Sequence, residues 1–237
     1  MRLDPHLSQG LVKTLLWTLT GFTLLILIFI IADIAVKGLP QVTPAFLSQD
    51  STDMGRAGGI FPTIVATAYI TLLAILLASP LGVGTAIYLT EYTREGWATR
   101  IIRFGSECLA GVPSIILGLF GFVLFVLKLG FGWSVLSGGL TLAIMVLPAA
   151  SSGIITAIIL GMGRAIGETM AVIMVAGNAL QIPTSLLDPV RTLTSNIALE
   201  LGYAAGRHRE ALFATGIVLF IIIMILNLSA TLITRRR

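Results

Sequence analysis

Apolar runs long enough to cross a bilayer follow one another along this chain. A transmembrane helix needs about 20 mostly apolar residues, and residues 15–36 form the first such run. The later runs lie at 60–88, 109–127, 136–147, 154–177 and 212–233. The pattern predicts an all-α integral membrane protein with about six transmembrane helices.

Two stretches of this pattern need interpretation. The run 15–36 follows Arg2 and Lys13, is longer than the core of about 7 to 15 residues found in a signal peptide, and has no small-residue cleavage site after it. We therefore expect an uncleaved first span. The stretch 136–177 is too long for one crossing, so we expect it to turn once near residues 148–153.

The distribution of basic residues predicts the orientation. Lysine and arginine are enriched on the cytoplasmic side of membrane proteins. With the N-terminus inside, the cytoplasmic segments hold eight of them, and the outer segments hold six over longer loops. The count favours an N-in, C-in topology, in which the longest outer loops are 37–59 and 179–210.

Composition excludes a water-soluble domain. Hydrophobic residues make up 56% of the 237 residues and charged residues only 11%, whereas a soluble domain has about 25% charged residues. The net charge of +4 fits basic loops facing membrane lipid rather than a nucleic-acid surface. A single cysteine, Cys108, excludes an intrachain disulfide and a cysteine-based zinc site. We expect no metal and no cofactor.

A charged pair inside the fifth span is the most informative motif. Arg164 lies about ten residues into the span, or about 15 Å deep at 1.5 Å per residue, and Glu168 lies one helical turn further. Such charges are costly in a bilayer and usually face a partner or a water-filled path. Arg164 would then contact a permeating anion that Glu168 holds or screens. The alternative is a pair that only locks helices together.

Three glycines surround this pair. Gly161, Gly163 and Gly167 would thin the helix and let another backbone or a substrate approach closely. Glu107 opens the third span, and Pro113 kinks it and frees a backbone carbonyl, which suits the wall of a path. Alternatively, Glu107 only favours a helix start at the interface.

The outer loop 179–210 carries both signs of charge, which suits electrostatic docking of a soluble partner. Solvated loop charge is the alternative. The candidate docking residues are Asp188, Arg191, Glu200, Arg207, Arg209 and Glu210.

Signs of enzymatic chemistry are weak. The segment 136–140 reads Leu-Ser-Gly-Gly-Leu, similar to a signature of ABC-transporter ATPases, but the chain has no phosphate-binding GxxxxGK[ST] loop. His6 and His208 lie outside the predicted spans, and Asp33 is the only aspartate within one, so an intramembrane protease is disfavoured. We expect no catalytic residues.

Four separated segments, at 79–92, 107–120, 163–169 and 196–213, together resemble the permease subunit of the bacterial phosphate-specific ABC importer. The resemblance implies a MetI-like permease domain at 58–237, after a tail, first helix and external loop at 1–57. It also implies a second homologous permease, a dimer of cytoplasmic ATP-binding subunits, an external phosphate-binding protein and an inner-membrane location. Arg164 and Glu168 match the charged pair of that family's translocation path.

One departure from the family concerns coupling to ATP hydrolysis. Permeases of this superfamily carry a cytoplasmic EAA loop between the fourth and fifth spans, and here it is apparently deleted near 148–149. The remaining cytoplasmic segments offer no amphipathic helix for an ATPase cleft, with 93–103 short and marginal. We therefore expect poor ATPase binding. An anion channel, an ion-coupled secondary transporter and a non-transporting assembly subunit stay open as alternatives.

Overall fold

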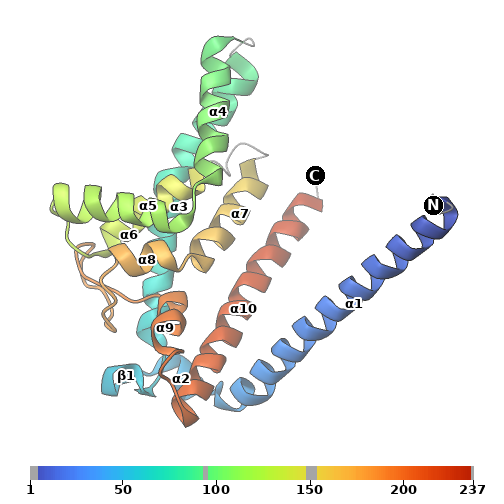
Figure 1. The fold of residues 1–237 in the computed structure, drawn as a ribbon. Helices are drawn as coiled ribbons and strands as arrows, with labels where there is room; N and C mark the ends of the chain where they lie inside the picture. The colour runs from blue at the N-terminus through green and yellow to red at the C-terminus, as the bar shows by residue number, and fades with distance from the viewer. Residues whose placement is uncertain (1–4, 93–95, 148–153, 236–237) are drawn as a thin grey trace.

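The structure is a computed structural model that describes residues 5–92, 96–147 and 154–235. Almost all of its regular structure is helical (Figure 1), which confirms the all-α class. The elements are α1 (Pro5–Gly38), the 3-10 helix η1 (Leu39–Gln41), α2 (Pro44–Ser48), β1 (Ser51–Thr52), the 3-10 turn η2 (Asp53–Gly55), β2 (Ala57–Gly58), α3 (Phe61–Ile87), the π-helix η3 (Tyr88–Tyr92), α4 (Trp97–Gly111), α5 (Ser114–Gly121), the π-helix η4 (Phe122–Lys128), α6 (Val135–Val146), α7 (Ile154–Gly167), α8 (Met170–Val175), α9 (Leu193–Glu200) and α10 (Gly206–Arg235).

Long apolar helices form the frame of the molecule. Within the described residues, three helical stretches are long and apolar enough to cross a membrane, at Gln9–Gln41, Phe61–Ile87 and Gly206–Ser229. They correspond to the predicted first, second and last runs. A fourth candidate is the pair Thr99–Gly111 and Ser114–Lys128, which is bent by 101°.

The middle segments follow the predicted order but are not straight helices. The third run bends sharply at Pro113, which has no N–H to continue the helix before it. The fourth, α6, is as short as its sequence suggested. The fifth was predicted as one helix over 154–177, and this is wrong, because it breaks after Gly167 and restarts at Met170. The expected turn at 148–153 lies outside the described residues.

The core is built around α3. Ala66, Ile70, Ala74 and Ala78 repeat every fourth residue and are all buried, so they form one face of the helix. This face packs against α6, where a Cβ on Gly138 would lie 3.2 Å from Ile70 Cδ1. The Leu-Ser-Gly-Gly-Leu segment therefore sits in the first turns of α6, where its glycines bring α6 close to α3.

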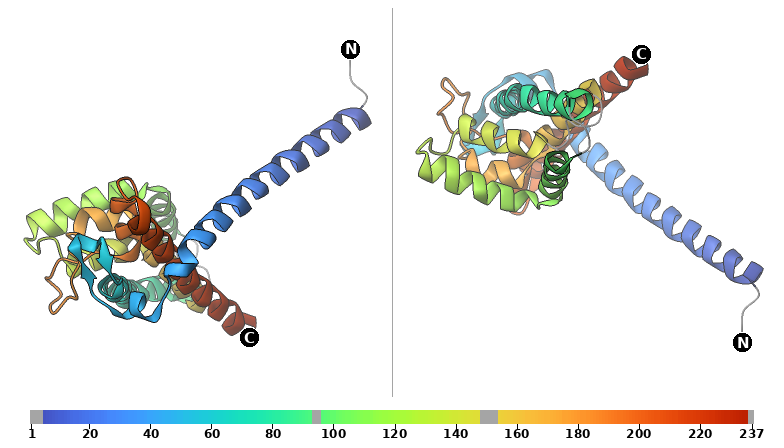
Figure 2. Two further views of the ribbon diagram at one scale, coloured as in Figure 1. Left: turned by 90° about the horizontal axis from the view of Figure 1, so that it is seen from below. Right: turned by 90° about the horizontal axis from the view of Figure 1, so that it is seen from above.

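The start of α1 and the end of α10 lie on the same side of the molecule (Figure 1), and the N-in, C-in orientation stays a prediction. At the opposite end, α2, the β1–β2 hairpin and α9 surround the starts of α3 and α10. The hairpin pairs Ser51 with Gly58 and Thr52 with Ala57. Figure 2 shows α1 leaving the body of the molecule in both views. The division into 1–57 and 58–237 stays a prediction.

Candidate functional site

The break between α7 and α8 is organised by Glu168. Its Oε1 accepts hydrogen bonds from the backbone N–H groups of Thr169 at 3.2 Å and Ala171 at 3.3 Å, so the carboxylate caps the start of α8. Its backbone carbonyl accepts a hydrogen bond from the Thr194 hydroxyl at 3.0 Å. Glu168 thus ties α7, α8 and α9 together at one half-buried point.

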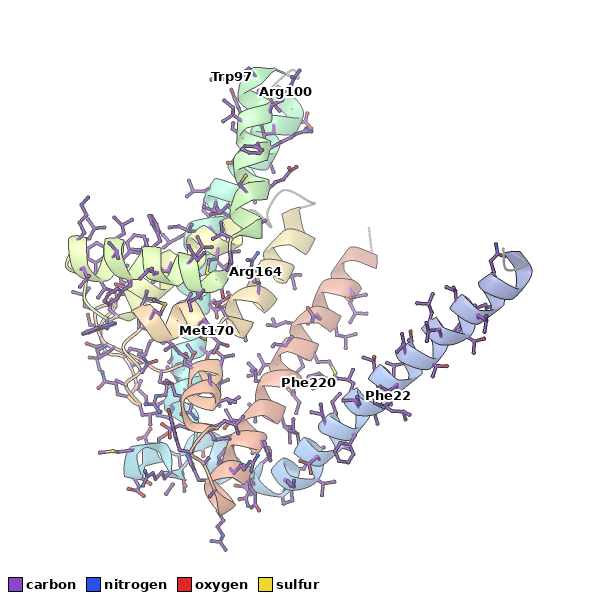
Figure 3. All side chains as sticks on the ribbon, viewed as in Figure 1. Phe22, Trp97, Arg100, Arg164, Met170 and Phe220 are labelled. Atoms are coloured by element: carbon purple, nitrogen blue, oxygen red, sulfur yellow. The ribbon has the colours of Figure 1, made fainter. Side chains whose placement is uncertain are left out.

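Arg164 lies on α7 and its side chain is exposed (Figure 3). Among the described residues it makes no ion pair and no hydrogen bond. The predicted pair with Glu168 on one helix face is wrong, because the helix ends at Gly167 and the carboxylate turns to the α8 amides instead. Within the described structure, the Arg164 guanidinium is therefore available to bind a ligand or a second protein on the exposed side of α7.

The three glycines of α7 have different surroundings. A Cβ on Gly161 would lie 2.6 Å from Val146 Cγ1, so this glycine allows close packing on α6. A Cβ on Gly163 would only touch Asn227 Oδ1 at 3.8 Å, and Gly167 has nothing within 4 Å. Among the three, only Gly161 is closely packed, against a side chain of α6, and the close approach of a substrate or a second backbone stays a prediction. Gly167 shares an open side of α7 with Arg164, three residues before it.

Glu107 and Pro113 differ from their predicted setting. Glu107 belongs to α4 rather than to the start of the third span, and its side chain is exposed. Pro113 stands at the N-cap of α5, where it breaks the chain direction instead of kinking a continuous helix. The break separates Glu107 from the spans that follow.

Residues 97–111, predicted to lie partly in a loop with at most a marginal helix, form the 15-residue helix α4. Its polar and apolar residues fall on different faces. The expectation that no amphipathic helix remains between the second and third spans is wrong. The helix ends only three residues into the predicted third run, which begins at residue 109.

The predicted external docking charges do not behave alike. Arg191 Nη1 lies 3.0 Å from Glu200 Oε1, and the two side chains are only 15% and 22% exposed. Arg191 Nε also donates to the carbonyl of Asn178 at 2.9 Å. These two residues hold α9 onto the loop before it. Their predicted exposure is therefore wrong.

Of the other external charges, Asp188 and Glu210 are half-buried, and Glu210 accepts a hydrogen bond from Gln41 at 2.9 Å. Arg207 and Arg209 are exposed at the start of α10, and Arg209 lies 5.7 Å from the centre of the Phe213 ring. Asp188 accepts hydrogen bonds from the backbone N–H groups of Ser185 at 2.8 Å and Thr184 at 2.7 Å. These bonds, led by the one from Ser185, lower the pKa of Asp188 from its ordinary 3.8.

Sequence reasoning missed two polar residues with defined surroundings in this region, His208 and Asn178. His208 Nε2 lies 3.6 Å from Glu200 Oε2, and both ring nitrogens are buried without a hydrogen bond in the described structure. Asn178 donates to the carbonyl of Ile173 at 2.8 Å and adopts φ 58°. An Asn after a glycine is a turn signal that could have been read. The described residues hold no group of three metal-ligating side chains.

These helices define an all-α, multi-pass integral membrane protein. The phosphate transport system permease protein PstC of Pasteurella multocida (strain Pm70) is 34% identical over 242 residues, which cover 75% of this chain and 75% of that protein. PstC of Haemophilus influenzae (strain ATCC 51907 / DSM 11121 / KW20 / Rd) is 30% identical over 303 residues, with 97% and 96% covered. The chain belongs to the family of phosphate ABC-importer permease subunits.

A protein named as PstA, a differently named phosphate permease, is also similar to this chain. The phosphate transport system permease protein PstA of Xylella fastidiosa (strain Temecula1 / ATCC 700964) is 26% identical over 195 residues, which cover 66% of this chain and 68% of that protein. No protein-family model matches the chain, and no solved structure matches it.

Proposed function

We propose that this chain is the PstC-type permease of an ATP-driven importer and forms, with a second permease, the path for inorganic phosphate. The similarity to proteins named as phosphate transport permeases carries this proposal. The higher identity to two PstC proteins, 34% and 30%, than to a PstA protein, 26%, supports the PstC type.

Arg164 is the residue that contacts phosphate in this proposal. It is a cation without a partner among the described residues, on the open side of a broken helix, and a second permease can complete the enclosure there. A guanidinium can bind two oxyanion oxygens at once. Glu168 then acts by fixing the helix break, and it does not neutralise Arg164.

The test is phosphate uptake by cells in which this chain is the only PstC-type permease. Arg164→Gln should reduce uptake by at least tenfold at equal abundance in the membrane, and Arg164→Lys should restore only part of it, since lysine lacks the planar fork. Lys128→Gln removes an exposed cation at the end of η4 and should leave uptake unchanged. Normal uptake by Arg164→Gln would refute substrate contact.

The remaining parts of the importer follow from the family. We assign to it a dimer of cytoplasmic ATP-binding subunits, which carry the hydrolytic activity, and an external phosphate-binding protein in the bacterial inner-membrane setting. Exposed Arg207 and Arg209 remain candidates for docking the binding protein. Asp188, Arg191 and Glu200 would shape the docking surface from within, because their polar atoms already hold loop and helix partners.

The absence of an EAA loop near 148–149 is also part of the proposal. The alignment with the Haemophilus influenzae relative runs over 303 residues, 66 more than the 237 residues of this chain. At least 66 aligned positions of that relative therefore have no counterpart here. This supports a missing internal segment, and the apolar junction after Leu147 is the place that the sequence favours.

A further inference from the structure

The helix break between α7 and α8 contains no proline, so contacts from elsewhere in the fold must keep it open. The hydropathy pattern predicts one helix over 154–177, yet α7 ends at Gly167 and α8 begins at Met170. The Glu168 carboxylate holds the α8 side of the break by accepting hydrogen bonds from α8 amides. The backbone carbonyl of Glu168 needs a donor of its own, because a carbonyl released from a membrane helix must find another partner.

Thr194 of α9 supplies this donor. Its hydroxyl donates to the Glu168 carbonyl at 3.0 Å, and the residue is only 7% exposed. The two residues are 26 positions apart in the chain, so the hydrogen bond joins separate segments. In Figure 1, α9 lies next to the place where α7 and α8 meet.

A row of three buried hydroxyl groups fixes the direction of this hydrogen bond. A hydroxyl has one hydrogen to donate, and Thr194 uses its hydrogen on the Glu168 carbonyl. The Thr192 hydroxyl, 3.1 Å away, must therefore donate to Thr194. The Ser195 hydroxyl, 2.9 Å from Thr192, must in turn donate to Thr192. The row is a buried chain of hydrogen bonds that runs in one direction and ends on the helix break.

Helix α9 is itself held at both ends. At its start, the buried Thr67 of α3 accepts a hydrogen bond from the Leu193 amide at 3.0 Å. At its end, Glu200 Oε1 lies 3.0 Å from Arg191 Nη1. The Thr194 hydroxyl is therefore presented to the break by a fixed helix.

We propose that Thr194 is a positioning residue for phosphate transport, because its hydroxyl keeps the α7–α8 break open and thereby sets where the Arg164 guanidinium lies. The inference rests on the proposed function, in which Arg164 contacts the phosphate. Without the hydroxyl, the Glu168 carbonyl is free to accept the amide of Val172, four residues ahead, as in a continuous α-helix. The uninterrupted helix that the sequence predicts is then the competing structure.

The packing of α8 determines which side of the break would move. A Cβ on Gly118 of α5 would lie 2.7 Å from Ala171 Cα, so α8 is tightly packed on α5. Closing the break would therefore shift the end of α7, where Arg164 lies (Figure 3). Arg164 is four residues before Glu168, about one helical turn from the break. Its side chain would leave its position in the candidate path.

The test is phosphate uptake per membrane-inserted copy, in cells in which this chain is the only PstC-type permease. Thr194→Val keeps the side-chain shape without the hydroxyl and should reduce uptake by about tenfold, because the buried carbonyl loses its donor. Thr194→Ala should show the same loss. Thr194→Ser keeps the hydroxyl and should stay within about twofold of the unsubstituted chain. The matched control is Thr215→Val, which removes a buried hydroxyl that donates to Ala211 in its own helix, and it should leave uptake unchanged.

A double-mutant cycle separates the placement of Arg164 from a general structural role. Added to Arg164→Gln, Thr194→Val should lower uptake by less than about twofold further, because no guanidinium is left to place. An additive loss in that background, normal uptake by Thr194→Val alone, or no rescue by Thr194→Ser would overturn the positioning role and leave the Arg164 contact intact. Failure of both hydroxyl-free variants to insert into the membrane would show a folding role and overturn it too. Normal uptake by Arg164→Gln would overturn the proposed function as well.

Discussion

Gly118 controls the distance between α5 and α8, and a single methyl group tests this contact. In Gly118→Ala the new Cβ would lie 2.7 Å from Ala171 Cα and 3.2 Å from Ala171 Cβ. Carbon atoms in contact prefer about 3.5 to 4.0 Å. The first clash is with backbone, so a rotamer change cannot relieve it, and the two helices must separate by about 1 Å.

The expected cost follows from two opposing terms. Overpacking of a well-packed site costs about 1–3 kcal/mol, and replacing a helical glycine by alanine returns up to about 1 kcal/mol. We expect a net loss of about 1–2 kcal/mol in the free energy of unfolding, a factor of about 5–30 in the ratio of folded to unfolded protein.

The assay is reversible unfolding in mixed micelles, combined with hydrogen exchange at the Ala171 amide, which the Glu168 cap protects. Gly105→Ala is the matched control, because Gly105 lies inside α4 and has nothing within 4 Å. It should be neutral or slightly stabilising. If Gly118→Ala matched the control in stability and left the exchange of Ala171 unchanged, the tight α5–α8 contact would be refuted.

Two further predictions concern the external segment. Glu200→Gln leaves Arg191 half-buried without its counter-charge and should cost about 1–2 kcal/mol of unfolding free energy, since hydrogen bonds to charged groups contribute about 1.5–3 kcal/mol and this pair keeps some solvent contact. Glu107→Gln, which breaks no ion pair in the described structure, should be neutral in the same unfolding assay. The folded pKa of Asp188 lies below 3.8, so its support of the 184–188 turn is complete above that value and is lost as pH falls through the folded pKa. The protection of the turn amides, measured relative to their intrinsic exchange rate at each pH, should fall there, and Asp188→Asn should show low protection at every pH. The same pH-dependent protection in the variant would contradict this prediction.

Hydropathy predicted the long helices well, since α3 and α10 owe their length to unbroken apolar runs. The second run was expected to start at residue 60, and α3 starts at Phe61. Pattern reasoning failed where tertiary contacts decide the structure. The helix break at Glu168 has no proline to signal it, and it depends on a carboxylate that binds the next helix's amides. The Arg191–Glu200 pair joins the loop before α9 to the last residue of α9, and hydrophobic periodicity does not report such a contact.

The fixed contact at the end of α1 has a mechanical consequence. A Cβ on Gly38 would lie 2.8 Å from the backbone nitrogen of Ala214, so α1 and α10 touch closely there, and α1 then diverges along its whole length (Figure 1). The 34 residues of α1 form an arm of about 51 Å at 1.5 Å per residue. A rotation of about 5° at Gly38 would move the far end of this arm by about 4 Å. A small repacking at one glycine is thereby amplified into a displacement about as large as a side chain.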